Sequence, residues 1–313
     1  MEKIHHIIFL STFSAALLLL ACGPSYQEQQ RLKQEQLREQ HRQDSAALKV
    51  AVMPTLDCLP LFLAYDHGMF DTLGVSVRLR CFQAQMDCDT AIARGRVEMT
   101  VSDLVRTERM MSQGVKLQYL TSTNAYWQLL ANRSRRVREL KQLDDKMVAM
   151  TRYSVTDMLC DIAIDSAKLK QERVFKVQMN DVNLRLKMLQ NNEMDALVLT
   201  EPQAAVARQG RHSLLLDTRK LHINMGVIAY SSTATAGKKR QQQLKLFAKA
   251  YNQACDSLNS RGVGAYRHLL GKYYQPLPEN IDSVYARLRF TRISPPEEKD
   301  VERARTWLKK ASK

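Results

Sequence analysis

The chain has 313 residues, and its 47 Lys and Arg outnumber its 32 Asp and Glu, for a formal net charge of +15. Such an excess of positive charge attracts anionic lipid headgroups, anionic solutes or nucleic acid. The amino-terminal leader argues against nucleic acid, because it directs the chain out of the cytoplasm. From residue 48 onward about 265 residues remain, enough for two ordinary domains or one long α/β unit with a sizeable core.

The amino-terminal segment has the pattern of a secretory leader that ends in a lipid-attachment site. Lys3 supplies the positive region, residues 7–21 are apolar, and a Leu-Leu-Ala-Cys sequence ending at Cys22 resembles the bacterial lipobox. A transmembrane anchor is the alternative, but the apolar run is shorter than the roughly 20 residues that span a membrane. We expect residues 1–21 to be a lipoprotein signal peptide and Cys22 to be acylated, which anchors the protein in the cell envelope facing the periplasm or the exterior.

Residues 22–47 are expected to form a polar tether. From Gln27 to Ala47 the chain is rich in Gln, Glu, Arg and Lys and has hardly any large apolar residue, so it cannot build a core. Its acidic and basic residues cancel, which assigns the net positive charge to the remainder of the chain. This composition favours a solvated helix or a stiff coil that rises about 1.5 Å per residue where helical. Such a segment would lift the body off a membrane.

Short β-like runs alternate with amphipathic stretches through the body, which favours a mostly parallel sheet covered by helices. The expected strands are residues 48–53, 75–79, 97–102, 116–121, 146–150, 174–178, 196–199, 213–216 and 225–230. The alternation begins again from about Tyr126, so we expect two α/β lobes. From Lys238 onward the pattern predicts helices separated by prolines.

Helix starts are predicted from aspartates that can cap them. We expect Asp57 to cap the first helix of the body, with Pro60 tolerated in the opening turn. Asp87 or Asp89 is expected to cap the second helix.

Several segments carry motifs of a known family. They are residues 53–60 (MPTLDCLP), 64–70 (AYDHGMF), 73–77 (LGVSV), 89–99 (DTAIARGRVEM), 139–149 (ELKQLDDKMVA) and 189–202 (LQNNEMDALVLTEP). Their order and spacing resemble the type II solute-binding proteins of ABC transporters, in the branch that takes nitrate, sulfonates, taurine and thiamine-pyrimidine precursors. The resemblance covers nearly the whole body. It departs where Asn191 or Asn192 replaces the usual glycine and where Asp144 interrupts the usual turn.

The resemblance implies an α/β, two-lobed type II periplasmic-binding-protein fold with a ligand cleft between the lobes. Lobe 1 would comprise residues 48–124 plus 226–313, including C-terminal helices, and lobe 2 would comprise residues 125–225. The chain would cross between them near residues 122–125 and 224–226. The implied protein is a monomer without cofactor or metal that delivers a small-molecule solute to an ABC permease and ATPase.

Candidate solute contacts follow from the rule that ligands of open α/β sheets bind beyond the carboxyl ends of the strands. The rule selects Thr55, Leu56, Asp57, Ser102, Asp103, Thr151, Ser154, Thr156 and Glu201, and Asn124 near the first crossing is a candidate besides. The alternative is local: Asp57 and Asp103 only cap helices, and Thr151 and Ser154 only bond loop backbone.

The charge of the expected solute stays open. Carboxylates of Asp57, Asp103 and Glu201 in the cleft would favour an amino or cationic solute, whereas the positive body favours an anion. Local groups decide what is held, while a surface field steers encounter. Trp127 and Tyr153 are further candidates, as an aromatic wall for a flat ligand, although a core or surface role is the alternative for each.

The sequence lacks the nucleophile-elbow, zinc-protease, phosphate-loop, dinucleotide and paired-cysteine motifs of common enzymes, so we expect no enzymatic activity. Two alternatives remain: a solute-sensing lipoprotein without transport, and an enzyme of menaquinone or thiamine-pyrimidine synthesis on the same fold. Once Cys22 is set aside, an odd number of cysteines remains, so at least one is unpaired. Cys81 and Cys88 flank a loop that can bring them together.

Overall fold

The computed structural model describes the backbone of residues 26–311 and the side chains of residues 26–39 and 46–311. The expected signal peptide, the acylation site Cys22 and the first residues of the tether lie outside the described residues. The chain divides into residues 1–47 and a compact unit, residues 48–313. Among residues 26–311, no helix combines the length and apolar character that crossing a bilayer requires.

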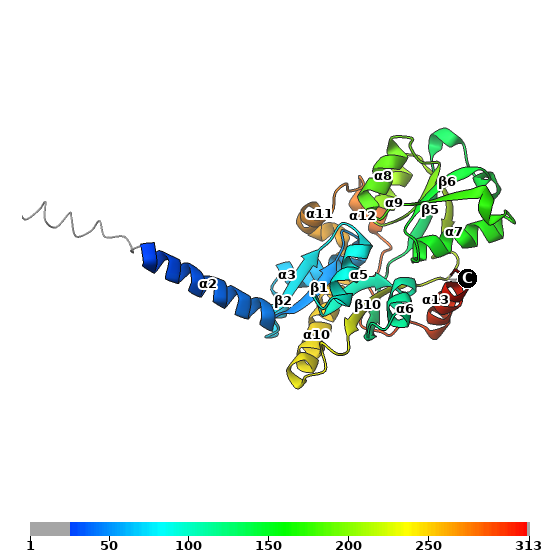
Figure 1. Ribbon diagram of the computed structural model, residues 1–313. Helices are drawn as coiled ribbons and strands as arrows, with labels where there is room; N and C mark the ends of the chain where they lie inside the picture. Colours follow the sequence, from blue (N-terminus) through cyan, green and yellow to red (C-terminus); the bar gives the residue numbers. More distant parts are fainter. Residues whose placement is uncertain (1–25, 312–313) are drawn as a thin grey trace, which may run out of the picture. The chain divides into compact units, whose positions relative to one another are not determined.

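The described part of the tether is one helix, α2 (Tyr26–Ala46), coloured dark blue in Figure 1. The side chains of residues 26–38 are exposed, and Arg31 pairs with Glu35 one turn later at 3.6 Å. Of the two expected conformations, a solvated helix or a stiff coil, the structure has the helix.

The body contains two five-stranded sheets. The first has the order β2-β1-β3-β10-β4, built from β1 (Leu48–Val52), β2 (Val77–Cys81), β3 (Met99–Asp103), β4 (Leu117–Ser122) and β10 (Gly226–Ser231). The second has the order β7-β6-β8-β5-β9, built from β5 (Trp127–Ala131), β6 (Lys146–Met150), β7 (Val174–Gln178), β8 (Ala196–Thr200) and β9 (Ser213–Asp217). We call the parts built on these sheets the first and second lobes.

Each sheet has one antiparallel strand, and that strand arrives from the other lobe. β10 runs antiparallel to β3 and β4, and β5 runs antiparallel to β8 and β9, while β1 pairs in parallel with β2 and β3, and β6 with β7 and β8. The two crossings are therefore residues 123–126 and 218–225. All nine expected strands are present to within two residues at each end.

Strand β5 was not predicted. Its sequence, Trp-Gln-Leu-Leu-Ala, has no apolar-polar alternation because four of its five residues are buried. Both faces of β5 are covered, because Leu129 and Ala131 pack into one core cluster and Leu130 into another, so the period of two disappears.

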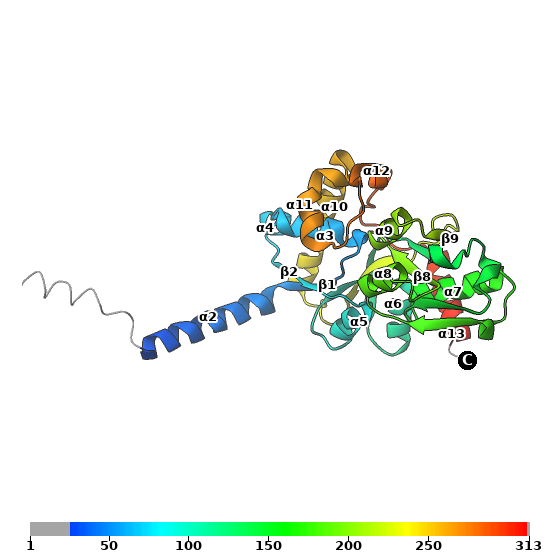
Figure 2. The ribbon, with the colours of Figure 1, turned by 90° about the horizontal axis from the view of Figure 1, so that it is seen from above.

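Helices cover both sheets (Figures 1 and 2). The helices before the first crossing are α3 (Leu59–Asp66), α4 (Met69–Thr72), α5 (Gln85–Ala93) and α6 (Leu104–Ser112); those between the crossings are α7 (Val155–Ser166), α8 (Val182–Gln190) and α9 (Gln203–Gln209); the tail has α10 (Lys238–Arg261), α11 (Arg267–Tyr273), α12 (Ile281–Tyr285) and α13 (Glu298–Ala311). Short 3-10 turns are η1 (Leu56–Cys58), η2 (Arg133–Arg135), η3 (Leu140–Leu143), η4 (Gln171–Arg173) and η5 (Val263–Tyr266).

The last helix contacts both lobes. Helix α13 packs against α6 of the first lobe, where Arg305 Nε donates to Glu108 Oε2 at 2.9 Å. From the same helix, Trp307 Nε1 donates to Asp161 Oδ2 of α7, in the second lobe, at 2.9 Å. Helix α13 therefore adds a contact between the lobes beyond the two crossings.

Two of the expected helix caps are wrong. Asp57 lies in η1, and α3 begins after Cys58 without a side-chain cap, although Pro60 does lie in its first turn. Helix α5 begins after Ala84, so neither Asp87 nor Asp89 is its cap. The carboxylates of Asp57 and Asp89 instead bond to residues distant in sequence, which local spacing cannot reveal.

The cysteines of the described residues are all free: Cys58, Cys81, Cys88, Cys160 and Cys255. Cys81 is exposed, while Cys88 is buried. No disulfide links Cys81 to Cys88 among the residues described here.

Gly226, at the start of β10, is the point where the two crossings touch. A Cβ atom on Gly226 would lie 2.6 Å from the Cβ of Ala125 and closer still to Thr123 Oγ1. We expect Gly226→Ala to lower the free energy of unfolding by about 1–3 kcal/mol, because overpacking forces neighbouring backbone to shift. Urea denaturation measures this loss.

The matched control is Gly271→Ala in α11, where an added Cβ meets nothing within 4 Å. Because alanine favours a helix over glycine, this variant should be stabilised by up to about 1 kcal/mol. Equal losses in the two variants would contradict the close contact at Gly226.

Candidate functional site

A small cavity lies between the lobes, where the carboxyl ends of β1 and β3 face those of β6 and β8. Its volume is about 60 Å³. The lining residues are Met53, Thr55, Asp57, Gln85, Val101, Ser102, Asp103 and Arg106 from the first lobe, and Trp127, Thr151, Ser154, Val155, Thr156, Arg185 and Thr200 from the second. Apolar residues of both lobes, Met53 and Leu199 among them, belong to one buried cluster. The lobes thus meet closely, and a solute larger than a few water-sized groups requires them to separate.

Eight of the twelve candidate residues line this cavity. They are Thr55, Asp57, Ser102, Asp103, Trp127, Thr151, Ser154 and Thr156. They come from opposite lobes and are brought together because the ends of parallel strands meet at one edge of each sheet.

The other four candidates lie elsewhere. Leu56 is part of the apolar core. Asn124 lines a separate cavity of about 470 Å³ beside the crossings. Tyr153 lines a larger cavity of about 960 Å³ between α7 and α13, with the guanidinium of Arg109 4.5 Å from its ring centroid. Glu201 is buried in a network of its own.

The Glu201 carboxylate faces α9 and the tail of the chain. Its Oε1 accepts from Tyr126 Oη and from Arg208 Nη1, both at 2.8 Å. Its Oε2 accepts from Ala205 N and from Tyr285 Oη, both at 3.1 Å. Four donors satisfy this carboxylate, so its contacts are structural. The Glu-Pro motif alone did not reveal these contacts.

Asp103 caps a helix and contacts the other lobe. Its Oδ1 accepts from the backbone N–H of Arg106, in the first turn of α6, at 3.0 Å. The same oxygen accepts from the backbone N–H of Val155, in the first turn of α7, at 3.2 Å. Burial raises the pKa of Asp103 to about 7, against the opposing effect of the Arg106 guanidinium. Asp103 therefore both caps α6 and lines the cavity.

The α7 end of the cavity is a hydroxyl cluster. Ser154 Oγ accepts from Thr156 N at 3.1 Å, which caps α7, and donates to the carbonyl of Thr151 at 2.7 Å. Thr151 N donates to Thr156 Oγ1 at 2.8 Å. These bonds to loop backbone, which were the alternative for Thr151 and Ser154, occur in residues that also line the cavity.

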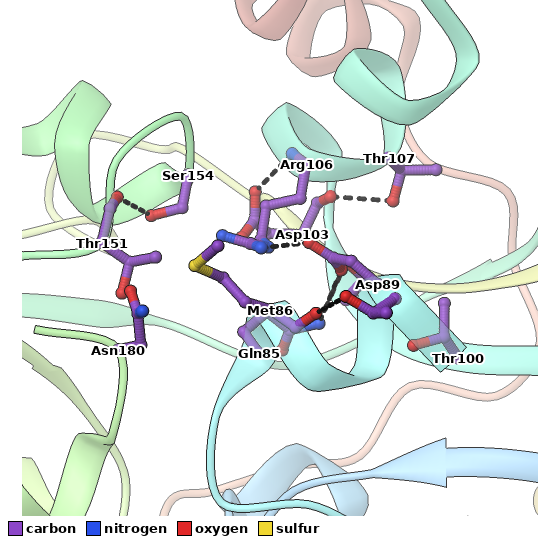
Figure 3. A network of polar contacts seen from close by, with 12 residues as sticks. Gln85, Met86, Asp89, Thr100, Asp103, Arg106, Thr107, Thr151, Ser154 and Asn180 are labelled. Carbon is purple, nitrogen blue, oxygen red and sulfur yellow. Dashed lines mark hydrogen bonds and ion pairs between the residues drawn. The ribbon is translucent and has the colours of Figure 1, made fainter. Parts of the chain in front are cut away.

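Arg106 forms the polar centre of the first lobe's side (Figure 3). Its guanidinium is ion-paired with Asp89 of α5, while its Nε has no hydrogen-bond partner among the described residues. Gln85 Nε2 donates to Val101 O at 3.1 Å and to Ser102 Oγ at 3.3 Å. In Figure 3, Thr151 and Ser154 of the second lobe are seen beside Arg106.

Arg185 is a buried cation on the second lobe's side. It is 6% exposed, and its Nη1 donates to Val198 O at 2.7 Å. Among the described residues, its Nε has no hydrogen-bond partner and no carboxylate pairs with it. Burial lowers its pKa to about 10. A buried charge without an ion pair is costly, so this side chain is ready to interact with an acceptor in the cavity.

Asp57 connects the cavity to a crossing. Its Oδ2 accepts from Thr123 Oγ1, in the first crossing, at 3.1 Å. Burial raises its pKa, although this hydrogen bond acts in the opposite direction.

Sequence reasoning missed both arginines. Val182, Leu186 and Leu189 recur at helical spacing on α8, and Arg185 lies on that same buried face. An arginine within an apolar stripe was a signal that could have been found. Arg106 has a weaker signal, its position three residues after the cap Asp103.

Comparisons with known proteins agree with this architecture. The alkanesulfonate-binding protein SsuA from Xanthomonas axonopodis pv. citri, bound to MOPS, matches with a TM-score of 0.72 and 17% identity over 84% of this chain and 91% of that one. The aliphatic sulphonate binding protein SsuA from Escherichia coli gives 0.69 and 17%, over 84% and 92%. The nitrate-binding protein NrtA from Synechocystis PCC 6803 gives 0.66 and 12%, over 76% and 69%.

These likenesses show the fold, the two-lobed α/β architecture of type II periplasmic binding proteins. Comparison with curated protein sequences gives no match. The family model described as "NMT1/THI5 like" matches residues 55–260, more than half of the chain. The chain therefore belongs to the NMT1/THI5-like family.

Proposed function

We propose that this protein is an extracytoplasmic solute-binding protein, lipid-anchored through Cys22, that captures a small molecule between its lobes and delivers it to an ABC importer. The cavity between the lobes carries this proposal, because both lobes line it with buried polar side chains. The structural neighbours named for sulfonate and nitrate binding support it. The anchor and the permease and ATPase partners rest on the leader and on the resemblance.

The proposed solute is small and polar. The cavity offers it hydrogen-bond donors on Arg106 Nε and Arg185 Nε, which have no partner among the described residues. It also offers the carboxyl groups of Asp57 and Asp103.

A stability screen tests this proposal. The chain from residue 23 onward is melted with amines, pyrimidines, sulfonates, nitrate, polyamines and carboxylates. A solute at 100 times its dissociation constant adds about 2.7 kcal/mol to the folded state, which raises the midpoint by several degrees. Recovery of that solute unchanged supports a binding protein, whereas a product would overturn the proposal in favour of an enzyme. A panel without any stabilising solute would also count against it.

Arg185→Gln provides the sharper test. We expect it to weaken binding of the stabilising solute at least tenfold, about 1.4 kcal/mol, because the cavity loses one of its two unpaired arginine donors. Calorimetric titration measures the change. The matched control is Lys187→Gln, which removes an exposed positive charge from the same helix. Equal weakening in both variants would show that net charge, and not the cavity, determines affinity.

A further inference from the structure

The first turns of two helices from different lobes meet at one carboxylate. Helix α6 belongs to the first lobe and α7 to the second, and both donate a backbone N–H to Asp103 Oδ1, from Arg106 at 3.0 Å and from Val155 at 3.2 Å. Asp103 and Val155 are 52 residues apart in the sequence. The contact is therefore a tertiary link between the lobes, at the wall of the proposed solute cavity.

The amino end of a helix is a favourable place for an anion, because its N–H groups are unpaired and the helix dipole is positive there. At α6 and α7 the carboxyl group of Asp103 already takes this position. The Asp103 side chain is 4% exposed, so it is held in place and not free to turn into solvent.

The charged groups in and beside the cavity also disfavour an oxyanion as solute. Two acidic side chains, Asp57 and Asp103, line the cavity together with two basic ones, Arg106 and Arg185. One of the basic groups, Arg106, is already paired with Asp89. An added oxyanion would increase an existing excess of carboxyl groups, whereas a neutral, zwitterionic or cationic solute would not.

We propose that the Asp103 carboxyl group is the resident occupant of these two helix ends, that it holds the two lobes together and that it excludes small oxyanions from the cavity. This inference rests on the proposed solute-binding function and names its substrate class: a neutral, zwitterionic or cationic polar molecule. The acceptor atom of such a solute bonds to Arg185, and its donor group bonds to Asp57.

The chain provides a matched comparison in Asp181, which caps α8. Asp181 Oδ1 accepts from Asn183 N at 2.8 Å and from Leu184 N at 3.0 Å, and both donors belong to the same helix. The Asp181 side chain thus caps a helix within one lobe, although its backbone bridges Ala84 of the first lobe, while the Asp103 side chain itself reaches the other lobe. Serine caps a helix about as well as aspartate, so Asp→Ser removes the carboxylate at each position and keeps a cap.

The experiment measures oxyanion binding to the wild-type chain, Asp103→Ser and Asp181→Ser. Nitrate, sulfate and methanesulfonate are titrated calorimetrically at constant ionic strength with chloride as the balancing salt. We expect oxyanions to bind Asp103→Ser at least tenfold more tightly than the wild type or Asp181→Ser. Wild-type binding as tight as that of Asp103→Ser, or no gain in Asp103→Ser, would overturn the inference.

Small-angle X-ray scattering tests the link between the lobes. Asp103→Ser in chloride should have a larger radius of gyration than the wild type and Asp181→Ser, and an oxyanion should reduce it again. An unchanged radius in Asp103→Ser would contradict a role in holding the lobes together. If Asp103→Ser does not fold, Asp103→Asn keeps the side-chain volume and, at a pH above the pKa of Asp103 of about 7, tests the charge, with the same direction expected for oxyanion binding.

The outcomes separate this inference from the proposed function. If a solute from the stability screen binds the wild type but Asp103→Ser gains no oxyanion affinity, only the proposed role of Asp103 is wrong. Turnover of that solute would contradict the proposed function without changing the oxyanion result.

Discussion

Replacing Glu201 by alanine is expected to lower the free energy of unfolding by about 3–5 kcal/mol, the usual result of removing one partner from a buried ion pair. Glu201 is 2% exposed and accepts hydrogen bonds from Tyr126, Arg208, Ala205 and Tyr285. Its loss removes the acceptor of two tyrosine hydroxyls and the ion-pair partner of the Arg208 guanidinium, which keeps its hydrogen bond to Gln128. Urea denaturation followed by tryptophan fluorescence measures the change.

Two further variants test whether that loss of stability comes from the buried network. Glu172→Ala removes an exposed glutamate and should change stability by less than about 0.5 kcal/mol. Glu201→Gln keeps an acceptor oxygen for the tyrosines but removes the charge, so its loss should fall between those of the two alanine variants. A loss at Glu201→Ala no greater than at Glu172→Ala would contradict the buried network.

The second large effect is the dependence of stability on pH through Asp103. Its pKa is about 7 in the folded protein, against an ordinary value of 3.8, because burial penalises the charged form. Between these values the folded state binds a proton that the unfolded state does not, so stability falls as the pH rises. The stabilisation from protonated Asp103 is complete below about pH 4 and is lost as the pH rises through about 7. Its upper limit is about 4 kcal/mol.

The groups that act on Asp103 are the guanidinium of Arg106, which lowers its pKa, and the carboxylate of Asp89, which raises it. Asp103→Asn should remove this loss of stability, so the difference between variant and wild type should change steeply from pH 4 to 7. Asp144→Asn is the control: Arg173 holds the pKa of Asp144 below its ordinary value, so its difference from the wild type should stay nearly constant from about pH 4 to 7 and change only at lower pH, with the opposite sign. A constant difference for Asp103→Asn across this range would contradict the buried carboxyl.

The candidate site was only partly predictable, and its residues show why. The ends of β1, β3 and β6 identify Asp57, Asp103 and Thr151, because strand ends can be located from local patterns. Glu201 follows a strand in the same way, yet it turns toward Tyr126 and Tyr285, residues that are 75 and 84 positions away. Strand ends locate a loop, but they do not determine the direction of its side chains.

From the sequence alone came nine of the strands, the helical tail and the motifs of the family, because strand and helix periods and turn residues are local properties of the chain. Tertiary structure alone decided the antiparallel strand β5, the contact of Asp103 with α7 and the burial of Arg185 without an ion pair. Each of these depends on segments distant in sequence packing against one another. Such packing has no period that can be read along the chain.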